Sequence, residues 1–137
     1  MPLTKPHKIL FLSPYPFGKA PSQRLKYEQY YSIFQSHGYE LSSSSFMDED
    51  LWRVIYQKGF FFQKVLGIFK GYCRRVKDIF RLRQFDLIYI HLWVTPIGGS
   101  FFERIFAAFS KKMIYDIDDM VFLGHSSDAN TKLAFLK

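Results

Sequence analysis

The sequence has little of what disulfide-rich, secreted or membrane-spanning proteins need. It contains one cysteine, Cys73, so no disulfide can form within the chain, and this usage is typical of a reducing compartment. The first apolar run, at 9–12, is too short for a signal peptide. No segment reaches the roughly 18 uninterrupted apolar residues of a membrane-spanning helix. These absences predict a soluble, cytoplasmic protein.

Acidic residues are scarce in one part of the chain. The net charge is +7 over 137 residues, and between 58 and 83 the single acid Asp78 stands among eight lysines and arginines. Such a charge predicts an anionic partner, which is membrane lipid, nucleic acid or phosphate. The remaining composition is that of a globular protein, because 48% of the residues are hydrophobic and 16 are phenylalanine. We expect one domain over 1–137.

Short apolar runs alternate with amphipathic segments along the chain. The apolar runs predict strands, and a pattern of this kind predicts a Rossmann-like α/β fold, in which a parallel sheet has helices on both faces. Ligands of such folds gather at the carboxyl ends of the strands, so the loops 14–22, 91–98 and 116–126 become candidate site segments. We expect strands at 8–13, 39–46, 85–93 and 112–117, and helices at 23–38, 48–57, 60–83, 98–110 and from 126 onward.

The first of these loops, "PYPFGKAPSQR", contains a glycine just before a helix. Backbone amides around Gly18 could bind an anion near the helix N-terminus, with Lys19 and Arg24 adding positive charge. The alternative is a proline-rich connector without a ligand. The loop lacks the G-x-x-x-x-G-K-[ST] spacing of nucleoside-triphosphate sites and has no dinucleotide fingerprint.

The other two candidate loops carry a histidine and three aspartates. His91 ends the strand "DLIYIH", where an imidazole could act as an acid or base, hydrogen-bond a substrate hydroxyl, or be purely structural. Asp116, Asp118 and Asp119 follow the last strand in "YDIDD". Two carboxylates at i and i+2 could share a divalent cation, or could bind sugar hydroxyls, or could begin the next helix. Zinc is not expected, because Cys73 has no ligand partner at a suitable spacing.

The basic segment 60–83 has two interpretations. Its apolar residues at helical spacing are accompanied by Lys70, Arg74, Arg75 and Lys77. This combination predicts a helix that rests on an anionic membrane surface, while the alternative is an ordinary solvated helix. No nucleic-acid recognition motif accompanies the charge, so we do not expect nucleic acid as a partner.

Three stretches together resemble a known family. "ILFLSPYPFGKAPSQRLKYEQY", "FDLIYIHLW" and "KMIYDIDDMVF" are similar to the N-terminal domain of family 4 glycosyltransferases of the GT-B type. The resemblance implies one lobe of a two-lobed, metal-independent retaining enzyme that needs no cofactor beyond its nucleotide-sugar donor. This lobe would receive the acceptor, and the second lobe would bind the donor through an E-x7-E pair, which this sequence lacks.

The resemblance also implies roles for individual residues. His91 would face the cleft, the Gly18 loop would approach the donor phosphate, and Asp118 and Asp119 stand where many relatives have a His-Asp pair. We therefore expect the acceptor-binding half of a transferase that modifies a glycan or lipid-linked acceptor in cell-surface polysaccharide synthesis, at the inner face of the membrane. Alone, the 137 residues are expected to be inactive.

Two other functions stay open on the sequence. One is a metal-dependent GT-A transferase in which Asp116 and Asp118 hold manganese, although the proline-rich first loop suits that fold poorly. The other is a Rossmann-like binding or regulatory module without catalysis. A receiver-like version of that module needs acids on the first strand, and "KILFLS" has none.

Overall fold

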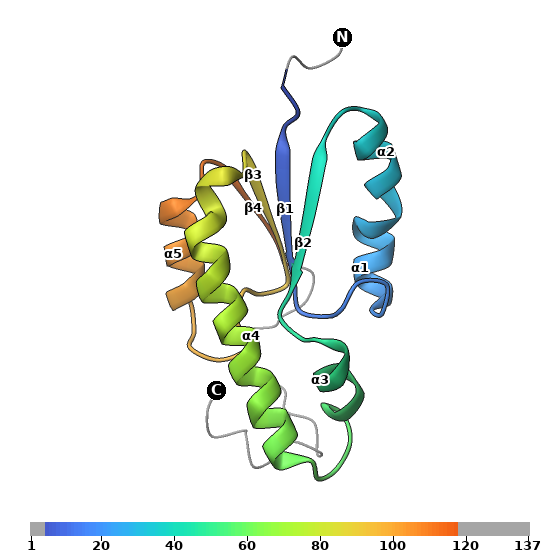
Figure 1. The fold of residues 1–137 in the computed structure, drawn as a ribbon, viewed down its shortest axis with the longest axis vertical. Helices are drawn as coiled ribbons and strands as arrows, with labels where there is room; N and C mark the ends of the chain where they lie inside the picture. Colours follow the sequence, from blue (N-terminus) through green and yellow to red (C-terminus); the bar gives the residue numbers. More distant parts are fainter. Residues whose placement is uncertain (1–4, 118–137) are drawn as a thin grey trace.

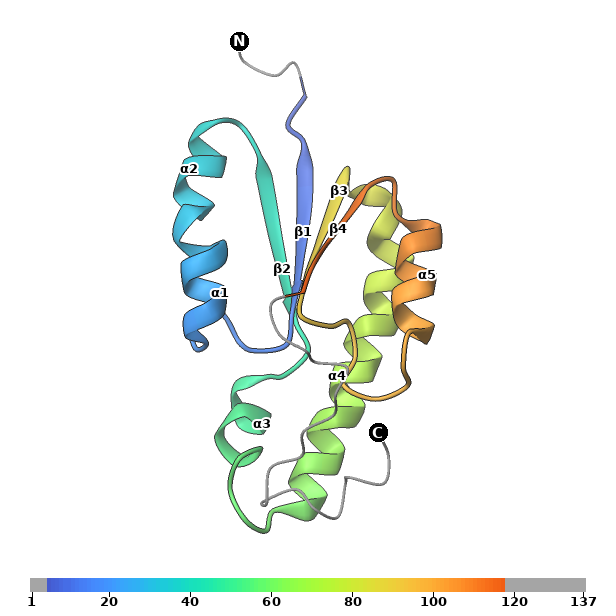
Figure 2. The ribbon, with the colours of Figure 1, turned by 180° about the vertical axis from the view of Figure 1, so that it is seen from behind.

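Four parallel strands form the centre of the molecule. A computed structural model describes residues 5–117 (Figure 1). The strands are β1 (Lys8–Ser13), β2 (Glu40–Ser45), β3 (Leu87–His91) and β4 (Met113–Asp116), arranged in the order β2-β1-β3-β4 with every pair parallel. Helices cover both faces of this sheet, as Figures 1 and 2 show from opposite sides. The predicted α/β fold with a parallel sheet is therefore confirmed.

One face of the sheet packs against the first helical segment. Alternate residues of β1 point to opposite faces, so Ile9 and Phe11 face this side and join a cluster around Tyr27. The segment consists of α1 (Pro21–Lys26), a 3-10 turn at Glu28–Tyr30 and α2 (Tyr31–Ser36). The prediction of one continuous helix over 23–38 was wrong, because the backbone leaves helical geometry at Tyr27 (φ −144°). This break accompanies a stacked contact between the Tyr27 and Phe11 rings, 5.1 Å apart.

The opposite face packs against two further helices. These are α4 (Phe61–Arg81), which is followed by a 3-10 turn at Leu82–Gln84, and α5 (Phe101–Phe109). Both were predicted, within a few residues at each end. Among residues 5–117, the buried cluster under these helices is the largest, and it contains Leu10, Leu12, Leu82, Phe85, Ile88, Ile90, Val94 and Phe106.

A smaller apolar cluster lies beyond the carboxyl ends of the strands, between α3 (Glu49–Val54) and the first half of α4. Asp48 caps α3 by accepting a hydrogen bond from the Leu51 amide (2.9 Å). A Cβ atom on Gly67 would lie 2.9 Å from Leu51, and one on Gly71 would lie 2.6 Å from the Phe46 ring. These two glycines lower helix propensity, but they permit the close approach of α4 to the cluster.

Arg75 of α4 joins the carboxyl ends of three strands. Its guanidinium is fully buried and donates to the carbonyl oxygens of Ser13 at the end of β1 (2.8 Å), Ser44 in β2 (3.1 Å) and Val94 after β3 (2.7 Å). Asp78, also buried, lies 3.3 Å from the same guanidinium and compensates its charge. Burial lowers the pKa of Arg75 to about 10, which leaves the side chain charged at neutral pH. This network holds together the edge of the sheet at which ligands of such folds bind.

Candidate functional site at the carboxyl edge of the sheet

The strand order places the ends of β3 and β4 side by side. His91 and Asp116 are paired residues in the register of these two strands. After His91 the chain turns sharply, with Leu92 in the left-handed region (φ 64°) and its amide donating to the Asp116 carbonyl oxygen (2.9 Å). A non-glycine residue in this conformation costs about 1 kcal/mol or more, and such strain is concentrated at functional sites. The turn brings a histidine and an aspartate to one edge.

The Asp116 carboxylate is the centre of a polar cluster on the face that α1 covers. The Tyr89 hydroxyl donates to its Oδ2 (2.7 Å), and the Lys26 ammonium lies 3.0 Å from both carboxylate oxygens. His91 Nδ1 lies 3.3 Å from Oδ2. Tyr89 and His91 share this face because they are two residues apart in β3. Lys26 reaches the cluster from the last turn of α1.

Electrostatics keep Asp116 ionised. Burial raises the pKa of this carboxyl, but hydrogen bonds from Tyr89, Lys26 and His91 outweigh burial and hold the pKa below its usual range. The side chains of Lys26 and Asp116 are 28% and 23% exposed, so a ligand can reach both. The pair thus presents a carboxylate acceptor and an ammonium donor next to each other, with nearly balanced charge.

His91 lies at the predicted place but is not accessible to a ligand in this arrangement. Its side chain is fully buried, and its ring meets the ring of Tyr27 edge-on at 5.6 Å. The catalytic role expected for His91 stays a prediction, and in this arrangement the imidazole has no exposed surface. What the imidazole does contact is Asp116, and it helps to orient that carboxylate toward the surface.

The loop that contains Gly18 is held by internal carboxylate and amide groups. The Gly18 amide, in a left-handed conformation (φ 75°), donates to the carboxylate of Glu28 (2.9 Å). The buried Gln23 side chain accepts from the Tyr15 amide and donates to the Tyr15 carbonyl and to Glu28. The amide predicted to bind a ligand anion therefore already binds an anion of the protein itself.

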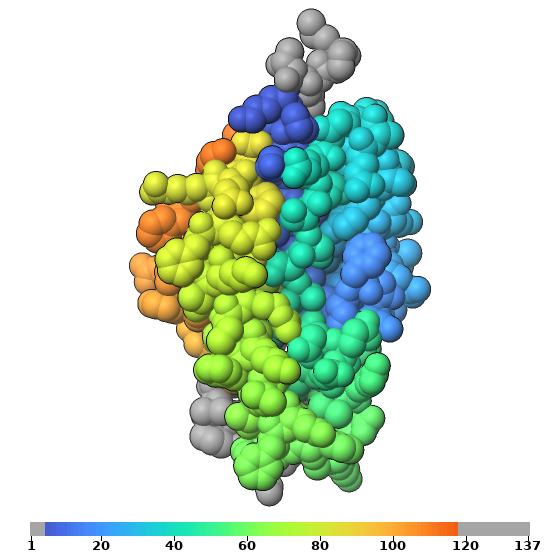
Figure 3. All heavy atoms as spheres, in the orientation of Figure 1, coloured from blue at the N-terminus to red at the C-terminus, as the bar shows by residue number. Residues whose placement is uncertain are grey.

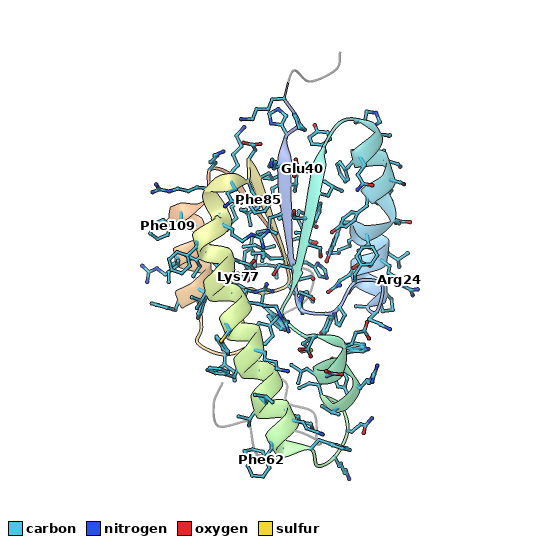
Figure 4. The ribbon with its side chains drawn as sticks, in the orientation of Figure 1. Arg24, Glu40, Phe62, Lys77, Phe85 and Phe109 are labelled. Atoms are coloured by element: carbon cyan, nitrogen blue, oxygen red, sulfur yellow. The ribbon has the colours of Figure 1, made fainter. Side chains whose placement is uncertain are left out.

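The two cations predicted to assist Gly18 do not converge on it. Lys19 pairs with Glu49 at the start of α3 (3.3 Å). Arg24 is exposed on α1 and projects outward from that helix (Figure 4). Of the predicted binding residues, Asp116 is the one that enters the polar cluster; Asp118 and Asp119 lie outside the described residues.

The basic residues predicted to face a membrane divide into two that turn toward the protein and two that are exposed. Arg75 does not face a membrane, because it is fully buried in the network described above, and the prediction for it was wrong. Arg74 turns toward the loop after β2, where it donates to the Phe46 carbonyl (2.6 Å) and pairs with Asp48 (2.9 Å). Lys70 and Lys77 are exposed. Within residues 5–117, no helix is both long enough and apolar enough to cross a membrane.

Sequence reasoning missed Lys26 and Tyr89. Tyr89 could have been predicted, since it stands two residues before His91 in a predicted strand and so lies on the same face of the sheet. No sequence pattern pointed to Lys26, because it is 90 residues from Asp116 in the chain.

In the described part of the chain, no three His, Cys, Asp or Glu side chains form a group that could hold a metal ion.

The fold defines the chain as an α/β protein with a four-stranded parallel sheet, consistent with a Rossmann-like fold. Comparison with protein-family models, with curated proteins and with solved structures finds no match. A fold of this class serves many unrelated functions, so the function must be inferred from the site.

Proposed function

We propose that this chain is the acceptor-binding part of a retaining glycosyltransferase of the GT-B type. The observation that carries the proposal is the partly exposed pair of Lys26 and Asp116 at the carboxyl edge, held in place by Tyr89 and His91. The sequence resemblance of the first loop, the third strand and the last strand to such enzymes adds support. The acceptor is a glycan or a lipid-linked sugar of cell-surface polysaccharide synthesis, modified at the inner face of the membrane.

The chemistry of the pair suits a neutral polyhydroxyl ligand. A carboxylate accepts hydrogen bonds from hydroxyl groups, and a neighbouring ammonium donates to hydroxyl or ring oxygens. Because Lys26 compensates the charge of Asp116, the site attracts neither a strong anion nor a second cation. Tyr89 and His91 fix the carboxylate before binding, which reduces the ordering cost of recognition. In this proposal His91 is a positioning residue.

The same pair favours metal-independent transfer over the GT-A alternative. A divalent ion at Asp116 would have to replace the Lys26 ammonium, which already lies 3.0 Å from both carboxylate oxygens. The donor nucleotide sugar is bound mainly by a second domain in the proposed enzyme, so the chain described here supplies the acceptor side of the reaction.

Binding of sugars to variant proteins tests the proposal. The full chain is screened on an array of oligosaccharides and polyprenyl-phosphate-linked sugars, and hits are measured by calorimetry. Asp116→Asn and Lys26→Met each remove one charge-assisted partner and are expected to weaken binding roughly tenfold or more.

The matched control is Asp86→Asn. Asp86 also pairs with a lysine, Lys111 (3.0 Å), but its other partner is the backbone amide of Lys8, and it lies at the opposite end of the sheet. Sugar binding should be unchanged in this variant. Equal affinities of the wild type and Asp116→Asn for every hit would refute the proposal.

A further inference from the structure

Helix α4 differs from an ordinary surface helix in what it buries and what it exposes. Such helices turn their apolar stripe to the core and their charges to water. The buried residues of α4 are instead Lys64, Gly67, Gly71, Arg75 and Asp78. Ile68, Tyr72 and Ile79 pack partly buried against the apolar cores, but other large apolar side chains face solvent, with Phe62 86% and Phe80 82% exposed. The fold therefore leaves one apolar side of its longest described helix in solvent.

The exposed apolar residues form one continuous stripe. We call it the α4 stripe; its members are spaced alternately four and three residues apart, and they are Phe62, Leu66, Phe69, Cys73, Val76 and Phe80. This spacing keeps side chains on one side of a helix along about 27 Å of its axis, at a rise of about 1.5 Å per residue. Figure 3 shows α4 lying across the front of the molecule in this orientation, and Figure 4 marks Phe62 near one end of the helix.

The neighbouring helix also exposes large apolar side chains. Helix α5 contacts α4 and exposes Phe101 (62%) and Phe109 (48%). Monomeric soluble proteins rarely leave contiguous apolar patches of such extent in water, and where they do the patch is an interaction site.

The charges beside the α4 stripe indicate which kind of surface it binds. Lys70 and Lys77 are exposed, and each follows directly on a stripe residue, Phe69 and Val76 respectively. The one acid of α4, Asp78, is buried against Arg75. Along α4, which the structure describes completely, every exposed charge is thus positive. In two copies packed stripe to stripe and antiparallel, these lysines would face each other and repel, whereas an anionic surface attracts them.

We infer that the α4 stripe docks on an anionic phospholipid bilayer. The helix lies in the plane of the surface, the phenylalanine side chains enter the boundary between headgroups and acyl chains, and Lys70 and Lys77 meet lipid phosphates. This surface is on the opposite face of the sheet from Lys26 and Asp116, so docking goes beyond the proposed sugar binding and does not depend on it.

Vesicle co-sedimentation of the full chain tests the inference. Vesicles consist of phosphatidylcholine alone or of phosphatidylcholine with phosphatidylglycerol. The wild type should bind the anionic vesicles, and added salt should weaken this binding. Lys70→Glu with Lys77→Glu should lower the partition coefficient roughly 30-fold or more, since each cation near the surface contributes about fivefold. Phe62→Ser with Phe69→Ser and Phe80→Ser should abolish binding.

Two controls separate docking from general effects. Arg24→Glu with Lys112→Glu reverses two exposed charges elsewhere, on α1 and just before β4, and should bind to a degree between the wild type and the stripe variants, with a loss below about threefold. Circular dichroism should show unchanged folding of the stripe variants, because their side chains are exposed.

Three results would overturn the inference. The first is equal binding of the wild type and the Lys70→Glu, Lys77→Glu variant. The second is no binding of the wild type to anionic vesicles. The third is a wild-type dimer in analytical ultracentrifugation that the phenylalanine variant loses, which would make a second copy the occupant of the stripe.

Discussion

Removal of the Arg75 guanidinium is expected to destabilise the whole carboxyl edge of the sheet. Arg75→Met keeps a side chain of similar length and deletes the hydrogen bonds to Ser13, Ser44 and Val94. It also leaves the buried carboxylate of Asp78 without its nearest cation. Arg81, the other cation near Asp78, is 3.8 Å away and considerably more exposed.

The magnitude follows from the burial of both partners. Breaking a buried ion pair by removing one partner costs about 3–5 kcal/mol, because the remaining charge stays desolvated. Domains of this kind have a free energy of unfolding of about 5–15 kcal/mol, so the change removes a large fraction of the total. The matched control is Lys77→Met, an exposed lysine on the same helix, where the expected change stays within about 0.5 kcal/mol.

Urea unfolding followed by circular dichroism at neutral pH measures these changes. A double variant, Arg75→Met with Asp78→Asn, removes the uncompensated charge and should recover part of the loss, more than about 1 kcal/mol. If Arg75→Met costs no more than Lys77→Met, Arg75 does not hold the edge together. If the double variant is no more stable than the single one, the loss does not arise from the buried charge of Asp78.

Three further predictions concern packing and titration. Gly71→Ala places a Cβ 2.6 Å from Phe46, so overpacking should outweigh the gain in helix propensity. The free energy of unfolding should fall by about 1–2 kcal/mol. Thermal denaturation measures this, and an unchanged melting temperature would contradict it. Tyr89→Phe removes a hydrogen bond to Asp116, so the pKa of that carboxyl should rise toward its usual value in an NMR titration, and a fall would contradict the assignment. The backbone amide of Lys8 and the ammonium of Lys111 lower the pKa of Asp86 to about 2. The stabilising contribution of Asp86 is therefore present above about pH 4 and is lost as the pH falls through about 2. The difference in free energy of unfolding between the wild type and Asp86→Asn, measured by urea unfolding, should vanish at the acidic end of this range. A difference independent of pH would refute this.

The sequence predicted β1 and β3 well because each is a short apolar run with clear boundaries, whereas β2 (ELSSSS) is largely polar. β1 and β3 contribute residues to the apolar clusters on both faces of the sheet, which is why the runs "ILFL" and "LIYI" carry no charged residue. The break between α1 and α2 at Tyr27 escaped prediction, since helical spacing of apolar residues continues across it. That break accompanies ring contacts with Phe11 in the sheet, a tertiary effect that no local pattern contains.

The orientation of α4 could not be predicted from its periodicity. An apolar stripe ordinarily turns to the core, yet here the inward side carries Arg75 and Asp78 because the partners of Arg75 are backbone carbonyls from three distant segments. Gly67 and Gly71, which lower helix propensity, are explained by their contacts with Leu51 and Phe46. Both reasons depend on the assembled fold.

The candidate site was predicted in part. The strand ends identified the edge of the sheet and the residues His91 and Asp116, but the depth of His91 and the partner Lys26 depend on how α1 lies against the sheet. The partner of the Gly18 amide could not be predicted either. This amide donates to Glu28, which the sequence placed within a helix, and no local pattern indicated that its carboxylate would contact the loop.

NMR mapping shows whether the carboxyl edge of the sheet binds a sugar acceptor. A ¹⁵N-labelled chain is titrated with the strongest ligand from the sugar array, and amide shifts are assigned. We expect shifts at 26, 89–93 and 115–117, with the amino-terminal edge around Asp86 and Lys111 unaffected. Shifts confined to that opposite edge, or to α4, would contradict it.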